Sequence, residues 1–352
     1  MPVSLYAMTR RQHEAHANLE QTAGFTRYQL MEGYEAGVEM IEVRNGSGLR
    51  FGVCPSRGMD IVWAEWRGLN LTWRHPNGVV APTYYGAENF DWLRGGPCGL
   101  LTTCGLGSFG PPCEDEGERY GIHDRIAYIP AREVSAQTQW QGDECHFEVR
   151  GTVRQTRLFG ANLRLDRAIA TKLGSNRLVV RDQLSNEGFE SAPAVVLYHC
   201  NFGYPLLEAG TQVIAPSSQV RARDEAAAQG LDGWSEVAAP TPTYAEQVFF
   251  HDLARDSEGY SRVGLWNPQR EVGVFLRFDG AQLPCFTQWK MLGAGAYVMG
   301  LEPSSAPLAS RSELRARGEL PILEPGETRT FEIEFEVVES SQPSSAEFRE
   351  AP

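Results

Sequence analysis

A histidine and a glutamate stand at the ends of two apolar runs in this sequence. His199 follows soon after the run 194–197, and Glu302 follows the run 297–301. A titratable side chain at the end of a buried strand is costly to bury without a partner, and a positioned histidine and carboxylate can act as general acid and general base. These residues predict acid–base chemistry. The simpler interpretations are a core histidine bonded to a backbone carbonyl and an ordinary strand-end acid.

Other polar residues could bind a substrate beside such a pair. Asn201 lies two residues after His199, so both side chains share one face of a strand. His123 stands next to Asp124 and Arg125, which could orient its ring and set its pKa. A solvated loop histidine is an equally good interpretation of His123.

Three more candidates have weaker signals when taken alone. Arg57 precedes a predicted strand, and its guanidinium could offer a donor fork to substrate oxygens, although a surface arginine is the commoner case. Trp289 offers an apolar ring face on which a sugar could lie, or it belongs to the core. We predict that the next residue, Lys290, also binds the substrate.

Several familiar motifs are absent or incomplete. The glycine pattern 105–110 fits G-x-G-x-x-G, but two prolines follow directly and block the helix that a dinucleotide site requires. The chain has no G-x-S-x-G or H-E-x-x-H pattern. Its seven cysteines include no C-x-x-C pair, and the wide spacing of Cys98, Cys104 and Cys113 favours free thiols in a reducing cytoplasm over a zinc site. We therefore expect no metal site.

Short strands with a period of two dominate the chain from residue 37 onward. The predicted strands are 38–43, 49–54, 60–66, 145–149, 163–170, 178–184, 194–202, 248–251, 272–278, 296–301 and 330–337. Residues 74–125 are rich in Gly, Pro, Tyr and Trp and have little periodicity, which indicates an ordered loop that could wall a site. Residues 216–245 read as a polar insertion. Many short strands and few helical patterns predict an all-β sandwich or barrel.

The bulk properties limit the partners. The chain has 352 residues and a net charge of −13, which argues against a nucleic-acid ligand. No apolar run could span a membrane, and the start of the chain does not look like a signal peptide. We expect one domain over 1–352, with an extension at 1–30 that could hold one helix and a disordered tail at 340–352. We expect it to be cytoplasmic, and a monomer or a homodimer.

As an ordered set, these residues resemble the aldose 1-epimerases, or galactose mutarotases. The blocks are 57–61, 99–106, 199–207 and 289–303, and they look most like an uncharacterised branch of the galactose mutarotase-like superfamily. The resemblance implies a β-supersandwich of large antiparallel sheets and a monosaccharide substrate. It implies that His199 is the general acid and Glu302 the general base of anomer interconversion. It also implies that His123 and an arginine of the first half bind the sugar, with no cofactor.

The sequence departs from the family pattern at positions that touch the sugar. The first histidine is followed by Asp124 and Arg125 in place of two glycines, and the second by Cys200 in place of an aromatic pair. The identity of the sugar is therefore open. Two alternatives remain beside anomerisation. One is epimerisation or isomerisation at a carbon next to the carbonyl, and the other is sugar binding without catalysis.

Overall fold

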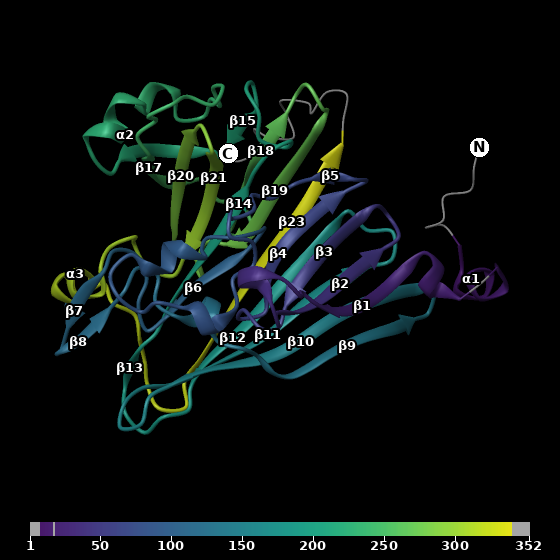
Figure 1. Ribbon diagram of the computed structural model, residues 1–352, viewed down its shortest axis with the longest axis horizontal. Coiled ribbons are helices and arrows are strands. Elements are labelled where there is room, and N and C mark those ends of the chain that lie inside the picture. The colour runs from purple at the N-terminus through teal and green to yellow at the C-terminus, as the bar shows by residue number, and fades with distance from the viewer. Residues whose placement is uncertain (1–7, 17, 340–352) are drawn as a thin grey trace.

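Antiparallel sheets make up most of the protein in the computed structural model, which describes residues 8–16 and 18–339 (Figure 1). The sequence explains why. In β11 (Asn162–Lys172), Leu163, Leu165 and Ile169 are buried, while the residues that alternate with them stay partly exposed. Every second side chain of a strand points to the same face. The predicted all-β architecture of large antiparallel sheets with few short helices is confirmed.

A five-stranded sheet uses the first part of the chain, with its strands side by side in sequence order. The strands are β1 (Ala23–Gln29), β2 (Glu39–Asn45), β3 (Leu49–Cys54), β4 (Asp60–Trp66) and β5 (Leu69–Asn70). An eight-stranded sheet has the order β15-β18-β19-β23-β12-β11-β10-β9. Its remaining strands are β9 (Arg132–Gln141), β10 (Glu144–Thr156), β12 (Arg177–Asn186), β15 (Gln212–Ile214), β18 (Tyr260–Asn267), β19 (Val272–Asp279) and β23 (Thr328–Glu339).

A six-stranded sheet carries the candidate site. Its order is β16-β17-β20-β21-β14-β6, so strands that are far apart in the sequence become neighbours. The strands are β6 (Thr102–Leu106), β14 (Val195–Phe202), β16 (Ser217–Ala222), β17 (Gln247–Leu253), β20 (Cys285–Gly293) and β21 (Ala296–Ser304). Two short pairs complete the strands, β7 (Cys113–Asp115) with β8 (Glu118–Tyr120) and β13 (Ala192–Pro193) with β22 (Ile322–Leu323).

The helical segments are short. They are α1 (Arg10–His16), α2 (Glu225–Gln229) and α3 (Arg311–Arg317), with 3-10 turns η2 (Leu19–Gln21), η3 (Gly33–Glu35), η4 (Pro82–Tyr84), η5 (Asp91–Arg94), η6 (Ile126–Tyr128) and η7 (Leu231–Gly233). Among the described residues, none of these helices is long and apolar enough to cross a membrane. The predicted tail at 340–352 lies outside the described residues, as do 1–7 of the predicted extension.

The main core lies between the sheets. Figure 1 shows the five-stranded sheet over β9–β12, and Phe25 of β1 meets Phe147 of β10 with ring centroids 5.8 Å apart. A smaller apolar cluster packs on the other face of the six-stranded sheet and includes Trp92, Leu197 and Leu314. Consequently β14 is buried on both faces, which fits the apolar run with which it begins.

A buried ionic network joins all three sheets beneath the site. Arg167 of β11 donates to both carboxylate oxygens of Asp182 on β12, at 2.8 and 2.6 Å, and lies 3.2 Å from Asp60 of β4. The hydroxyl of Tyr198 on β14 donates to Asp182 at 2.6 Å. Tyr198 precedes His199 and points to the opposite face of β14. The network therefore anchors the strand next to His199.

Candidate functional site

The strand register places His199 directly across from Glu302. β14 and β21 are antiparallel, and Leu197 pairs with Ser304 while Cys200 pairs with Leu301. Opposite residues of neighbouring strands point to the same face with their Cβ atoms about 4.5–5.5 Å apart. Nε2 of His199 accordingly lies 3.3 Å from Oε1 of Glu302, and the two residues are only 5% and 2% exposed.

Burial keeps this pair uncharged at neutral pH. Desolvation lowers the pKa of His199 well below its ordinary value of 6.5, and the nearby His123 lowers it further. Desolvation raises the pKa of Glu302 from 4.5 to about 8, with a smaller contribution from Glu246 that Arg223 opposes. The pair therefore holds one proton between an imidazole and a carboxyl group.

Both members of the pair have polar atoms without a hydrogen bond in the described part of the chain, although Oε1 of Glu302 lies 3.3 Å from Nε2 of His199. Within the described residues, Nδ1 of His199 and Oε1 of Glu302 are buried and make no hydrogen bond. Buried polar atoms are rarely left unpaired in folded proteins. Hydroxyl groups of a bound small molecule could satisfy these two atoms.

Aromatic rings surround the pair. The centroid of the Trp289 ring lies 5.4 Å from that of His199, and the centroid of the His123 ring lies 5.6 Å from it, both with nearly perpendicular planes. Trp92 packs against His123 with centroids 4.8 Å apart. The arrangement gives the acid–base pair aromatic walls of the kind that line small-molecule sites.

Gly300 makes room for this arrangement. It lies opposite Trp289 on β20, and a Cβ atom there would come within 2.6 Å of Oε1 of Glu302 and 3.3 Å of Cε1 of His199. Real Cβ atoms essentially never show a contact as short as the first. A side chain at position 300 would therefore displace the Glu302 carboxylate from its place beside His199.

His123 is held by the backbone of the long irregular segment. It adopts a positive φ of 60°, its Nδ1 accepts a hydrogen bond from the amide of Gly110 at 3.4 Å, and burial lowers its pKa to about 4. The neighbouring Asp124 accepts from the amide of Gly107 at 3.2 Å and from Gln155 at 2.6 Å. The side chain beside His123 therefore fixes the loop and does not project as a free ligand.

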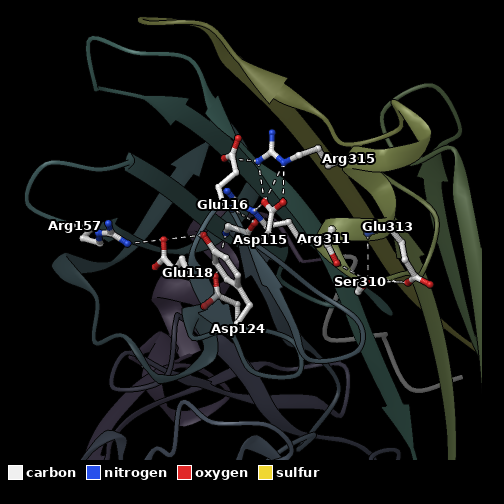
Figure 2. Close-up of polar contacts among 12 residues, drawn as sticks. Asp115, Glu116, Glu118, Asp124, Arg157, Ser310, Arg311, Glu313 and Arg315 are labelled. Carbon is white, nitrogen blue, oxygen red and sulfur yellow. Dashed lines mark hydrogen bonds and ion pairs between the residues drawn. The ribbon is translucent and has the colours of Figure 1, made fainter.

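Helix α3 braces the same loop from outside (Figure 2). Arg311 donates to Asp115 of β7 and to the carbonyl of Gly107, each at 2.7 Å, and Arg315 donates to Asp115 at 2.8 Å. Ser310 and Glu313 form a capping box at the start of the helix. Asp115, and through it the β7–β8 pair, is therefore tied to α3 by two arginines.

Two of the other sequence candidates are engaged by backbone groups. The buried guanidinium of Arg57 donates to the carbonyls of Ala127, Val80 and Gly95 at 2.5, 2.9 and 3.3 Å, so it braces the long segment. Lys290 follows Trp289 on β20, hence its side chain points to the opposite face, where Nζ donates to the Gly233 carbonyl at 2.7 Å. These two residues are not brought to the acid–base pair.

Asn201 and Arg125 are each engaged by other groups of the protein. Nδ2 of Asn201 donates to the carbonyls of His199 and Gly99 at 2.7 and 3.2 Å, while its buried Oδ1 has no partner in the described part of the chain. Arg125 is partly exposed and lies 3.4 Å from Asp124. Thus Asn201 steadies the strand beside His199, and Arg125 is already paired with a carboxylate.

Sequence reasoning missed four residues at the site. They are Trp92, Gly300, and the pair Arg223 and Glu246 that lies beside Trp289. Trp92 falls in the predicted site wall, so its residue type was a usable signal. The other three depend on strand pairings that no local pattern reveals.

The described residues show no grouped metal ligands, and they include two surface hollows. Among residues 8–16 and 18–339, no three or more His, Cys, Asp or Glu side chains are grouped to hold a metal ion. The seven cysteines are free thiols. Two surface hollows of about 520 and 460 Å³ adjoin Arg74 beside the five-stranded sheet, and their lining residues do not include His199 or Glu302.

Comparison with known proteins places this geometry in a family context. The family model described as Domain of unknown function (DUF4432) matches residues 35–337. A candidate aldose 1-epimerase from Klebsiella pneumoniae has a similar structure, with 25% identity, a TM-score of 0.85, and 90% of this chain and 84% of that chain covered. No curated protein matches the sequence.

More distant structures share the fold. A galactose mutarotase-like protein from Clostridium acetobutylicum has 14% identity and a TM-score of 0.61, covering 91% of this chain and 100% of its own. The galactose 1-epimerase from Lactobacillus acidophilus has 10% identity and a TM-score of 0.55, covering 90% of this chain and 99% of its own. The predicted galactose mutarotase-like fold is confirmed.

Proposed function

This chain belongs to the family described as Domain of unknown function (DUF4432), and we propose that it interconverts the anomers of a monosaccharide as an aldose 1-epimerase. The observation that carries the proposal is the cross-strand pair of His199 and Glu302, buried 3.3 Å apart with unpaired polar atoms beside a tryptophan ring. Two acid–base groups meet all the needs of this reaction.

The reaction moves two protons. The ring oxygen of the closed sugar receives one, the C1 hydroxyl loses one, and the bond between C1 and the ring oxygen breaks to give the open aldehyde. Rotation about the C1–C2 bond presents the other face of the carbonyl, and closure reverses both transfers. Each positioned acid or base contributes typically about 10²–10⁴ in rate.

The protonation state of the resting pair suits this task. An imidazolium with a carboxylate carries the same number of protons as an imidazole with a carboxyl group. Burial favours the neutral imidazole and carboxyl group. A substrate oxygen that hydrogen-bonds either group can favour the imidazolium and carboxylate instead. In the proposed reaction His199 protonates the ring oxygen and Glu302 takes the proton of the C1 hydroxyl, while Trp289 offers its ring face to the sugar.

Exchange NMR on a panel of pentoses, hexoses, a uronic acid and a sugar phosphate tests the proposal. The protein should accelerate exchange between the two anomeric signals of at least one sugar, and H199A and E302A should each lose most of that acceleration. The control H146A removes a histidine of β10 away from the site and should retain it. Circular dichroism of each variant checks folding.

The same samples distinguish the other functions. Equal exchange rates in wild type, H199A and E302A for every accepted sugar would show the proposal to be wrong. Uptake of deuterium from solvent into a C–H bond would identify epimerisation or isomerisation next to the carbonyl, because anomerisation exchanges only O–H protons. Sugar binding without any rate enhancement would identify a binding protein.

A further inference from the structure

An ion pair outside the acid–base pair lies beside the tryptophan of the site. Glu246 immediately precedes β17, and Arg223 immediately follows β16. Oε1 of Glu246 lies 2.9 Å from Arg223, and its Oε2 accepts a hydrogen bond from the indole nitrogen of Trp289, also at 2.9 Å. One carboxylate, directly after the polar segment 216–245, therefore links Arg223 of that segment to the ring that faces His199.

The indole of Trp289 is restrained at two points. Its ring meets His199 nearly edge-on, and its Nε1 is held by Glu246. Gly300 lies opposite it on β21 and offers no side chain against which the ring could rest. The hydrogen bond that Trp289 donates to Glu246 is therefore a polar contact that restrains the ring.

We propose that Glu246 is a positioning residue of the site, which holds the indole of Trp289 as a wall and, with Arg223, sets the charge that Glu302 faces. This inference deepens the proposed function and rests on it, since Trp289 is the surface on which the sugar would lie. Glu246 does not touch the reacting atoms and acts only through Trp289 and through its charge.

The electrostatic part has a definite sign. The carboxylate of Glu246 raises the pKa of Glu302, and the guanidinium of Arg223 lowers it. The other titratable groups around Glu302 are His199, which burial keeps neutral, and the thiols of Cys104 and Cys200, whose pKa values burial raises well above 9.0. Glu246 and Arg223 thus act on Glu302 in opposite directions.

Thermal unfolding across pH tests this without relying on turnover. In the wild type the melting temperature, compared with E302Q, should fall as pH rises toward about 8, because folded Glu302 keeps its proton. E246Q should end that fall at lower pH, and R223Q at higher pH. The control D252N removes the carboxylate of another exposed arginine pair, Arg221 of β16 with Asp252 of β17, and should leave unchanged the pH at which the fall ends.

A second measurement reports on the position of the Trp289 ring. E246Q retains an amide oxygen for the indole, whereas E246A removes the acceptor, so only E246A should alter the near-ultraviolet circular dichroism of Trp289. For an accepted sugar, E246A should raise KM about two- to tenfold with a smaller change in kcat, as expected for one lost hydrogen bond.

The outcomes separate the two proposals. If E246Q and R223Q titrate like the wild type and E246A leaves the indole signal unchanged, the inference about Glu246 is overturned. If those shifts appear but no sugar shows accelerated anomer exchange, the positioning role stands and the proposed reaction fails.

Discussion

At the scale of single residues, the chemistry depends on two groups that burial shifts in opposite directions. His199 loses its affinity for a proton and Glu302 gains affinity for one, so the pair stays neutral in a place where an isolated charge would be costly. Both shifts have desolvation as their first cause. They therefore depend on the packing around the pair, including Trp92 and Trp289.

The first prediction concerns the effect of pH on stability. Between the ordinary pKa of 4.5 and the folded value of about 8, the unfolded chain releases the proton of Glu302 while the folded protein keeps it. The free energy of unfolding should consequently fall with rising pH by at most about 1.4 kcal/mol per pH unit from this group. E302Q should lack this fall. Denaturant titrations at pH 6.5, 7.5 and 8.5 would measure it, and parallel curves for the two proteins would contradict it.

The second prediction concerns the effect of pH on rate. Above about pH 8 the pair loses its single proton and no longer contains an acid. Anomer exchange catalysed by the wild type should therefore decline above about pH 8, while it stays level from neutral pH down to the low pKa of His199. Exchange NMR from pH 6 to 9.5, corrected for the uncatalysed reaction, is the measurement. A rate that keeps rising with pH would rule out the one-proton pair.

The sequence could predict which residue types matter but not which way each side chain faces. His199 and Glu302 each end an apolar run, and that local signal located them. Trp289 and Lys290 are adjacent, so a strand must send them to opposite faces, and nothing local decides which one meets the site. The aromatic neighbours of Trp289 and the carbonyl that binds Lys290 come from distant segments.

At the scale of elements, the site depends on how closely β14, β20 and β21 approach one another. Strands with clear apolar alternation, such as β11 and β12, could be predicted from sequence. β9 (Arg132–Gln141) could not, because it lies at the edge of its sheet and is largely polar and exposed. β20 was missed because Gln288 and Lys290 occupy buried positions that would ordinarily be apolar.

A substitution at Gly300 tests the spacing of these strands. G300A adds a methyl group 2.6 Å from the Glu302 carboxylate, so Glu302 or Trp289 must move. A misplacement of about 1 Å in an active site can cost roughly 10²-fold in rate. We expect a loss of that order in anomer exchange. G233A is the matched control, since an added methyl there meets nothing within 4 Å. Full activity in G300A would mean that the pair tolerates displacement.

The docking of α3 gives a second prediction for an element. D115N should weaken the bonds to Arg311 and Arg315 and lower the free energy of unfolding by about 1–3 kcal/mol. R157Q breaks the neighbouring pair with Glu118 in Figure 2, which is more exposed, and should change stability by less than about 0.5 kcal/mol. Urea titration compares them. Equal effects would show that α3 is not anchored through Asp115.

At the scale of the whole molecule, the buried network around Arg167 joins the three large sheets. Asp182 is its centre, since it binds Arg167 and also accepts from Tyr198 beside the site. The sequence places these residues on separate predicted strands, and their meeting follows only from the sheet order. Their pairing could not be predicted because like patterns of strands can be stacked in several ways.

Removal of Asp182 should therefore affect the entire fold. D182N leaves the Arg167 guanidinium buried without its main counter-charge, and we expect a loss of about 3–5 kcal/mol in the free energy of unfolding. Y198F removes only one hydrogen bond and should cost about 0.5–1.5 kcal/mol. Denaturant curves followed by tryptophan fluorescence and by circular dichroism should coincide for both variants. A separate early transition in D182N would show that the sheets unfold independently.

The pairing of β14 with β21 has a consequence for how this protein can vary in length. Because His199 and Glu302 face each other on neighbouring strands of one antiparallel ladder, the spacing of their backbones follows from the hydrogen-bond spacing of the sheet. A deletion or insertion of a single residue within either strand, on the other hand, would send one member of the pair to the opposite face. Changes in chain length should thus be confined to turns such as 142–143 and 187–191, where an added or lost residue leaves the strand pairing unchanged.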